Sequence, residues 1–127
     1  MVGNAALRVI ICSGPEDGRR ATLGFAVAVA AMACGIAVHL FLVMNGVRWA
    51  LRSEGDRPAA PGFQSISEMI ETIQAGGGRI EICSSCVTGV CQGVPEAPQD
   101  EAMRDGILPG GLTSVAVRIG GIPTVTF

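Results

Sequence analysis

The sequence predicts an α/β fold with a mostly parallel sheet. Residues 7–12 and 36–43 form continuous apolar runs rich in β-branched side chains, which is typical of strands covered on both faces. Segments with helical patterning separate such runs, and strands that alternate with helices imply parallel pairing through right-handed crossovers. A length of 127 residues fits one domain and allows a substantial core.

A turn and a helix are expected after the first strand. Residues 13–18 are rich in turn formers, and Pro15 with its acidic neighbours is suited to the start of a helix. That helix is expected to run through Ala33 and to stop at Gly35, because glycine commonly follows the last helical residue.

The apolar run over residues 21–44 is longer than the ~20 residues that cross a bilayer, so hydropathy alone makes it a candidate membrane span. Its many alanines and the glycine stop favour instead a helix followed by a central strand. Residues 1–4 contain no basic region leading into an apolar stretch, so no secretory signal is expected. We therefore predict a cytoplasmic protein without a membrane span.

The second half of the chain contains a capped helix and a strand that ends at a cysteine. Ser65 and Glu68 have the spacing of a capping box, and the helix they start is expected to end at the glycines from Gly76. Residues 79–82 form a short strand that leads to Cys83. The remaining expectations are a helical turn over 47–51, an exposed loop over 52–62, a helical turn over 100–105, a helix over 113–119 and a last strand over 122–127.

The composition excludes several partners and favours an oligomer. Hydrophobic residues make up 49% of the chain and charged residues 16%, so its surface is short of charge, as at subunit interfaces. A formal net charge of −2 argues against nucleic acid as the main partner. Aromatic residues make up only 4% and there is no tyrosine, so stacking platforms for bases or sugars are not expected.

Cysteines form the strongest chemical signal, because Cys83, Cys86 and Cys91 fall within nine residues. An odd total of five cysteines does not fit a secreted disulfide framework, and clustered cysteines in a reducing compartment indicate metal binding or catalysis. The cluster follows a strand, at the carboxyl edge where open α/β sheets bind ligands. Backbone N–H groups there, near Ser84 and Ser85, favour the reactive thiolate.

Three functions could use this spacing. Cys83 could accept a sulfur atom as a persulfide, or it could form a thiol–disulfide switch with Cys86 or Cys91. A zinc or iron–sulfur site is the third, and it is weakened because four ligands are usual and only distant His39 could complete the set. Three inert cysteines in a loop remain the alternative without function.

The histidine and the two cysteines outside the cluster have simpler interpretations. His39 lies within the second expected strand, where a buried histidine with satisfied hydrogen bonds is favoured over a ligand. Cys34 lies at the end of the first helix and is expected to pack against the sheet. Cys12 ends the first strand at the same edge as Cys83, so it could support the site, although packing is favoured.

Several segments, taken in order, resemble one known family. They share the pattern of turn, helix and strand that surrounds a cysteine after the third strand, and together they resemble the DsrE/DsrF-like family of sulfur-relay proteins. They are residues 13–17, the alanine-rich helix leading to Gly35, residues 45–47, the helix from Ser65, Cys83-x-x-Cys86 and residues 124–127.

The resemblance implies a single three-layer domain over residues 1–127, with a sheet of about five mostly parallel strands flanked by helices. It also implies a homo-oligomer, commonly a trimer or hexamer, although hetero-oligomers occur. Cys83 matches the persulfide-carrying cysteine, and Cys86 matches a second cysteine found in some relatives. Residues 87–99, which contain Cys91, depart from the family pattern and are expected to be an inserted loop.

The prediction is a cytoplasmic sulfur carrier or sulfurtransferase that holds a persulfide on Cys83. Cys86 or Cys91 would receive the sulfur or resolve the persulfide, and the donors and acceptors would be other carrier proteins. No cofactor and no metal are expected, and whether the chain is an enzyme in its own right is left open. The alternative is a non-enzymatic oligomer that responds to thiol oxidation or metal through Cys83, Cys86 and Cys91.

Overall fold

The computed structural model describes residues 5–87, 103–119 and 121–127. Its elements alternate between strands and helices along most of the chain. In chain order they are β1 (Ala6–Ile11), η1 (Pro15–Asp17), α1 (Gly18–Ala33), β2 (Ala37–Leu42), η2 (Met44–Ala50), α2 (Ile66–Ala75), β3 (Arg79–Cys83), α3 (Ser84–Cys86), β4 (Leu108–Gly110), α4 (Leu112–Ile119) and β5 (Thr124–Thr126).

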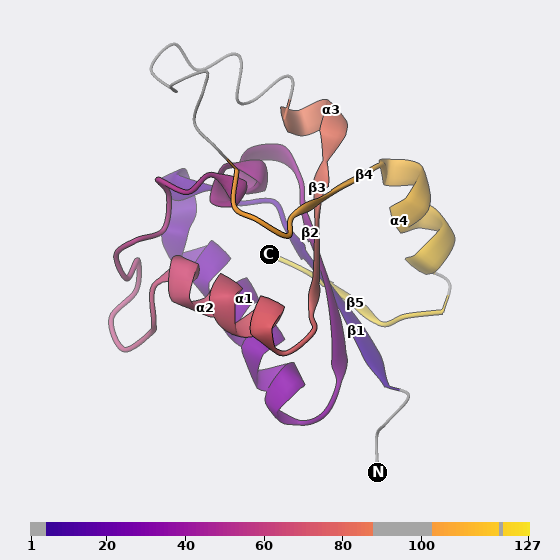
Figure 1. The fold of residues 1–127 in the computed structure, drawn as a ribbon, viewed down its shortest axis with the longest axis horizontal. Coiled ribbons are helices and arrows are strands. Elements are labelled where there is room, and N and C mark those ends of the chain that lie inside the picture. The colour runs from indigo at the N-terminus through magenta and orange to yellow at the C-terminus, as the bar shows by residue number, and fades with distance from the viewer. Residues whose placement is uncertain (1–4, 88–102, 120) are drawn as a thin grey trace.

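One five-stranded sheet, with the order β4-β3-β2-β1-β5, organises the described residues. All four pairings between these strands are parallel. Helices α1 and α2 lie together on one face of the sheet and α4 lies on the other (Figure 1). The predicted α/β class, the parallel pairing and the helix layers on both faces are confirmed.

The face under α1 and α2 forms the apolar core. Ile11 is level with Leu42 and Ile82 across three strands, and all three side chains are buried. Helix α1 approaches them closely, because a Cβ added at Gly24 would lie 2.3 Å from Cδ1 of Ile11. Small residues along α1 therefore let the helix lie against the sheet, and burial of the large strand residues stabilises the pair.

The apolar run over residues 21–44 is divided as its alanines and glycine predict. Helix α1 ends at Ala33, Gly35 takes the left-handed conformation with φ of 79°, and β2 starts at Ala37. Within residues 5–87, 103–119 and 121–127, no helix is long and apolar enough to cross a membrane. The single apolar run over residues 21–44 is therefore a helix, α1, followed by a strand, β2, and not one membrane-spanning helix.

Local start signals are also confirmed. The Ser65 hydroxyl accepts a hydrogen bond from the Glu68 N–H at 3.2 Å, which satisfies one of the free donors at the start of α2. Asp17 has the same function for α1, since its carboxylate accepts from the Arg20 N–H at 3.3 Å. Helix α2 starts directly after Ser65, as predicted, whereas Pro15 begins the short helix η1 and α1 starts three residues later at Gly18.

The segment after the cysteines differs from expectation where it is described. Residues 103–105 form no helical turn; instead Met103 pairs with Leu51 in an isolated antiparallel bridge. Strand β4 was not predicted, because a proline and a glycine in three residues disfavour a strand. Pro109 is tolerated there since β4 is an edge strand, where the missing N–H removes no central ladder bond.

Candidate functional site

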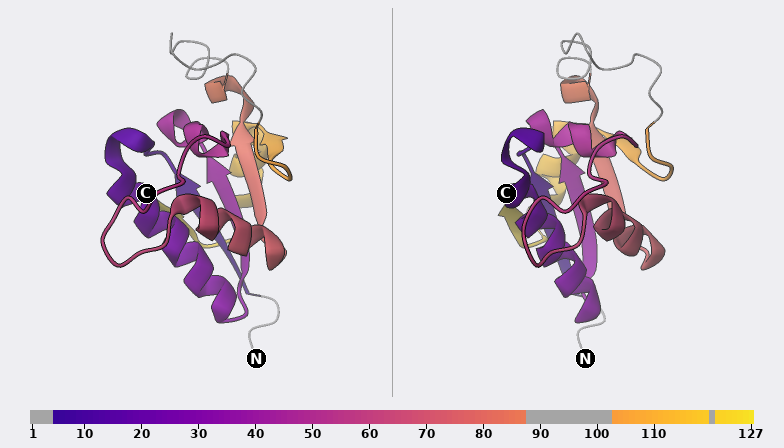
Figure 2. Two further views of the ribbon diagram at one scale, coloured as in Figure 1. Left: turned by 60° about the vertical axis from the view of Figure 1, so that its left-hand side comes forward. Right: turned by 90° about the vertical axis from the view of Figure 1, so that its left-hand side faces the viewer.

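The carboxyl edge of the sheet brings together the turns that follow β1, β2 and β3. Continuing the strand register by one residue places Cys12, Val43 and Cys83 level with one another. Turn η2 and helix α3 stand together beyond the ends of the strands, at the end of the sheet away from the N-terminus (Figure 2). Three separate turns therefore surround the position that Cys83 occupies.

Cys83 is the last residue of β3 and is only 1% exposed. It is also the N-cap of α3, a single helical turn that carries Cys86 back over the sheet edge. Cys86 is part-buried and lies at the last residue of this turn, close enough to Cys83 for the two thiols to influence each other's environment. The Cys-x-x-Cys spacing thus places the two thiols one helical turn apart at the sheet edge.

Burial raises the pKa of the Cys86 thiol, and the hydrogen bond from the Met44 backbone N–H opposes this rise. The hydrogen bond to Cys83 and the negative charges on Cys83 and Cys12 raise the pKa further. Burial and the neighbouring thiols therefore favour the neutral form of Cys86. A protonated thiol beside Cys83 can supply a proton when sulfur moves between the two residues.

Met44 holds an unusual backbone conformation at this edge. Of the described residues other than glycine, only Met44 has a positive φ, at 53°. A left-handed residue with a side chain is strained by roughly 1–2 kcal/mol. The strain occurs at the residue whose N–H contacts Cys86, and the Met44 side chain is 60% exposed beside it.

Close backbone contacts fix the turn after β2 against the turn after β1. The N–H of Gly46 donates to the Cys12 carbonyl at 3.2 Å, and the N–H of Cys12 donates to the Phe127 carbonyl at 2.7 Å. A Cβ added at Gly14 would lie 2.4 Å from the Asn45 carbonyl oxygen. Only glycine fits at position 14 without moving one of the two turns.

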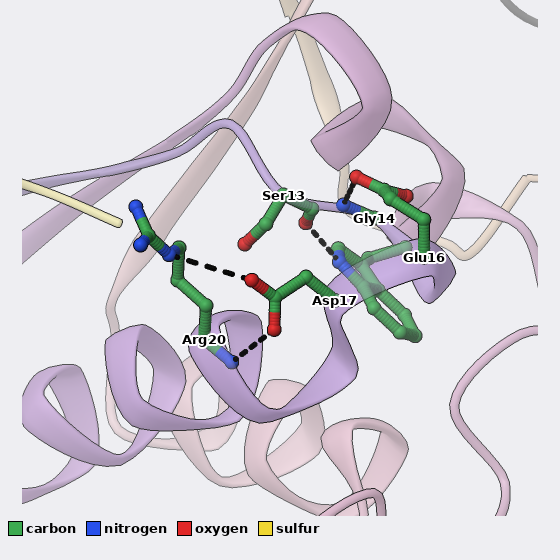
Figure 3. A network of polar contacts seen from close by, with 6 residues as sticks. Ser13, Gly14, Glu16, Asp17 and Arg20 are labelled. Carbon is green, nitrogen blue, oxygen red and sulfur yellow. Dashed lines mark hydrogen bonds and ion pairs between the residues drawn. The ribbon is translucent and has the colours of Figure 1, made fainter.

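Polar contacts hold the loop that follows Cys12 (Figure 3). The Gly14 N–H donates to Oε1 of Glu16 at 2.8 Å, and the Trp49 indole N–H donates to the Ser13 carbonyl at 2.8 Å. Arg20 reaches back to Asp17 in an exposed ion pair of 3.5 Å. The loop is therefore joined both to η2 and to the start of α1.

The structure describes two of the three predicted site residues. Cys83 and Cys86 lie together, as their spacing predicts, whereas Cys91 lies outside the described residues, as does all of the expected insertion over 87–99 except Val87. Among the residues that the structure describes, no three Cys, His, Asp or Glu side chains are grouped to hold a metal ion. The roles of Cys83, Cys86 and Cys91 remain predictions.

One residue of the edge, Met44, was not singled out from the sequence, since nothing there shows that a methionine takes a left-handed conformation. For Cys12 the sequence favoured packing over a supporting role, and its place at the end of the first strand was the signal for that role. Cys34 was expected to pack on the sheet, and this is wrong: it is exposed at the C-cap of α1.

A family model for the DsrE/DsrF-like family matches residues 6–107. The chain belongs to the DsrE/DsrF-like family. The match covers β1 to β3 and both cysteines of the Cys-x-x-Cys pair. Membership in the DsrE/DsrF-like family supports a role related to sulfur relay in general.

Solved structures confirm the fold. The ychN protein from E. coli superposes with a TM-score of 0.75 at 21% identity, covering 97% of this chain and 99% of that protein. BT1422, a conserved protein of unknown function from Bacteroides thetaiotaomicron, superposes with a TM-score of 0.60 at 16% identity, covering 100% and 98%.

A sequence relative extends the comparison to an archaeon. The uncharacterized protein MJ0760 from Methanocaldococcus jannaschii is 29% identical over 77 residues. These residues are 61% of this chain but 28% of that protein, so the chain matches less than a third of this relative's length.

Proposed function

We propose that the chain is a sulfur carrier or sulfurtransferase that holds a persulfide on Cys83 and exchanges it with partner proteins. The observation that carries this proposal is that the buried Cys83 ends β3 at the carboxyl edge of the sheet and Cys86 follows it by one helical turn. Family membership supports the same chemistry in general terms.

The loading step needs no oxidant. The Cys83 thiolate attacks the outer sulfur of a donor persulfide, a new S–S bond forms on Cys83, and the donor sulfur leaves as a thiolate. Because one S–S bond replaces another, the reaction is redox-neutral.

Cys86 supplies the proton and the next acceptor. Its raised pKa keeps the thiol protonated beside Cys83, and proton transfer to the Cys83 sulfur would convert Cys86 to a thiolate as it attacks the outer sulfur. Cys83 then leaves as the neutral thiol. Cys91 remains a second predicted acceptor, and the partners remain carrier proteins of the same chemistry in a homo-oligomeric setting.

The same placement favours a second function, a thiol–disulfide switch. Two thiols three residues apart at the junction of β3 and α3 are candidates for a disulfide when a two-electron oxidant is present. The switch would use Cys83 and Cys86 without carrying sulfur. It differs from the carrier in mass: a disulfide loses two protons, whereas a persulfide gains a sulfur atom.

Intact mass spectrometry after incubation with glutathione persulfide tests the proposal. The wild-type chain is compared with Cys83→Ser, Cys86→Ser and Cys91→Ser, and Cys34→Ser serves as the control because Cys34 is exposed and far along the chain from the cluster. A reductant-sensitive gain of sulfur that is lost in Cys83→Ser alone supports the carrier. A two-proton loss without sulfur gain contradicts it and favours the switch.

A further inference from the structure

A third cysteine, Cys12, lies at the same level of the sheet edge as Cys83. Strand β2 separates the two, and neighbouring strands are about 4.8 Å apart, so the two backbones lie about 10 Å from each other. This span is too long for direct sulfur transfer between Cys12 and Cys83. A side chain above the end of β2 would lie between them.

Cys86 lies on α3, and α3 contacts η2, the turn that follows β2. The backbone of Met44, the first residue of η2, lowers the pKa of the Cys86 thiol, so this thiol faces the end of the strand between Cys12 and Cys83. Two residues later, the Gly46 N–H donates to the Cys12 carbonyl at 3.2 Å. One turn therefore contacts both cysteines, Cys86 through its sulfur and Cys12 through its backbone.

Exposure differs among these three cysteines, and Cys83 is the least accessible of them. Cys83 is 1% exposed, whereas Cys12 and Cys86 are both part-exposed. A thiol on another protein can reach a part-exposed sulfur more readily than a buried one. Cys12 also lies on a turn fixed by Phe127 and Gly46, so its backbone is held in place without its thiol being enclosed.

We propose that Cys12 is a third sulfur acceptor, which takes the outer sulfur from Cys86 after Cys86 has taken it from Cys83. This proposal rests on the persulfide function of Cys83. The Cys12 thiolate attacks the outer sulfur of the Cys86 persulfide, an S–S bond forms on Cys12, and Cys86 leaves as a thiolate that recovers the proton given up by Cys12. The step is redox-neutral and needs no further reactant.

Electrostatics agree with this placement. A negative charge on Cys12 raises the pKa of the Cys86 thiol, so the two groups are close enough to interact across the edge. Such interactions fall off over about 10 Å at moderate ionic strength. Burial raises the pKa of the Cys12 thiol as well, which makes a Cys12 thiolate a stronger nucleophile once it forms.

Three separate tryptic peptides allow the sulfur to be followed. Cleavage after arginine yields residues 9–19 with Cys12, residues 21–48 with Cys34, and residues 80–104 with Cys83, Cys86 and Cys91. The full chain is given less than one equivalent of glutathione persulfide, quenched with iodoacetamide over a time course and digested without reductant. Cys34, exposed on α1, reports direct labelling by the donor.

We expect sulfur to enter peptide 80–104 first and to reach peptide 9–19 later, with peptide 21–48 unlabelled. Cys83→Ala and Cys86→Ala should each abolish the later signal on peptide 9–19. Labelling of peptide 9–19 that equals that of peptide 21–48 and persists in both variants overturns the relay. Sulfur that stays on peptide 80–104 overturns the relay but leaves the function of Cys83 intact. No sulfur on Cys83 overturns both.

A second experiment tests the proximity of Cys12 and Cys86 by oxidation and then the release of sulfur. Diamide, a two-electron thiol oxidant, should join Cys12 to Cys86 in the wild-type chain, giving a reductant-sensitive link between peptides 9–19 and 80–104. Cys12→Ser should then slow release of sulfur from the loaded chain to free glutathione severalfold, whereas Cys34→Ser should not. Absence of the link together with unchanged release contradicts the relay.

Discussion

Gly46 packs directly against the backbone of Ile11: a Cβ added at position 46 would lie 2.1 Å from the Ile11 carbonyl oxygen. The same carbonyl accepts a hydrogen bond from the Val43 N–H at 3.0 Å, so Ile11 holds the start of the turn while Gly46 covers it. This contact positions Met44, whose N–H reaches Cys86. A residue without a side chain at position 46 is therefore needed to hold the turn that carries Met44 next to the cysteines.

Gly46→Ala should lower the free energy of unfolding by about 3 kcal/mol, because a methyl group forced against a backbone carbonyl displaces the turn. Chemical denaturation measures the change. Gly111→Ala is the matched control, since an added Cβ there meets no atom within 4 Å, and it should change stability by less than about 0.5 kcal/mol. Equal effects of the two substitutions would contradict the packing argument.

The rate at which Cys86 reacts with iodoacetamide should rise with pH through a pKa above that of a free thiol, because burial and the neighbouring sulfur atoms disfavour its thiolate. Cys83→Ala removes one hydrogen bond and one neighbouring charge, so the apparent pKa of Cys86 should fall. Cys12→Ala should lower it by a smaller amount. Mass spectrometry across a pH series measures both shifts, and an unchanged profile in Cys83→Ala would show that the two thiols do not interact.

Arg104→Met should destabilise the chain by about 3 kcal/mol, because it removes hydrogen bonds from the guanidinium and leaves part-buried carbonyls without a partner. Arg104 donates to the Trp49 carbonyl at 2.8 Å, to the Ser67 hydroxyl at 2.7 Å and to the Glu54 carbonyl. Thermal and chemical unfolding measure the loss.

The control for this substitution is Arg20→Gln, which removes an exposed ion pair with Asp17. Exposed pairs contribute roughly 0–1 kcal/mol, so this variant should unfold almost as the wild type does. A similar cost for both arginines would mean that the hydrogen bonds of Arg104 contribute no more than an exposed ion pair. A larger cost for Arg104 supports its role in joining residues 103–105 to the loop after η2.

Ser65→Ala should cost about 1 kcal/mol, because the Glu68 N–H at the start of α2 loses its acceptor. Ser114→Ala is a suitable comparison, since the Ser114 hydroxyl only donates to the Gly111 carbonyl at 2.9 Å within the first turn of α4. Denaturant midpoints measure both, and a larger effect at Ser114 would contradict the capping assignment.

Much of the fold could be predicted because local signals agree with long-range packing. Gly35 ends a helix and leads to a strand, and Ser65 starts another, since each signal is a backbone requirement that few other residues meet. Strand β4 could not be predicted. It exists because Gly110 fits beside Glu81, where a Cβ would lie 2.6 Å from Oε2, and this contact joins residues 29 positions apart.

The candidate site was predictable only in part, because some of its residues are joined only by long-range packing. Cys83 and Cys86 are neighbours in sequence, so their spacing alone indicates a shared site. Cys12 is separated from them by more than seventy residues, and only the strand order β3-β2-β1 brings it to their level. The left-handed backbone of Met44 results from packing between two turns, which no local pattern encodes.

The indole hydrogen bond between Trp49 and the Ser13 carbonyl also gives the protein an internal optical reporter. Trp49 is the single tryptophan of the sequence, it is 3% exposed, and it joins η2 to the loop that follows Cys12. Its emission wavelength depends on contact with water, so the ultraviolet fluorescence of one residue would record whether the edge that holds the thiols stays closed. Sulfur loading could then be followed in real time without attaching a dye.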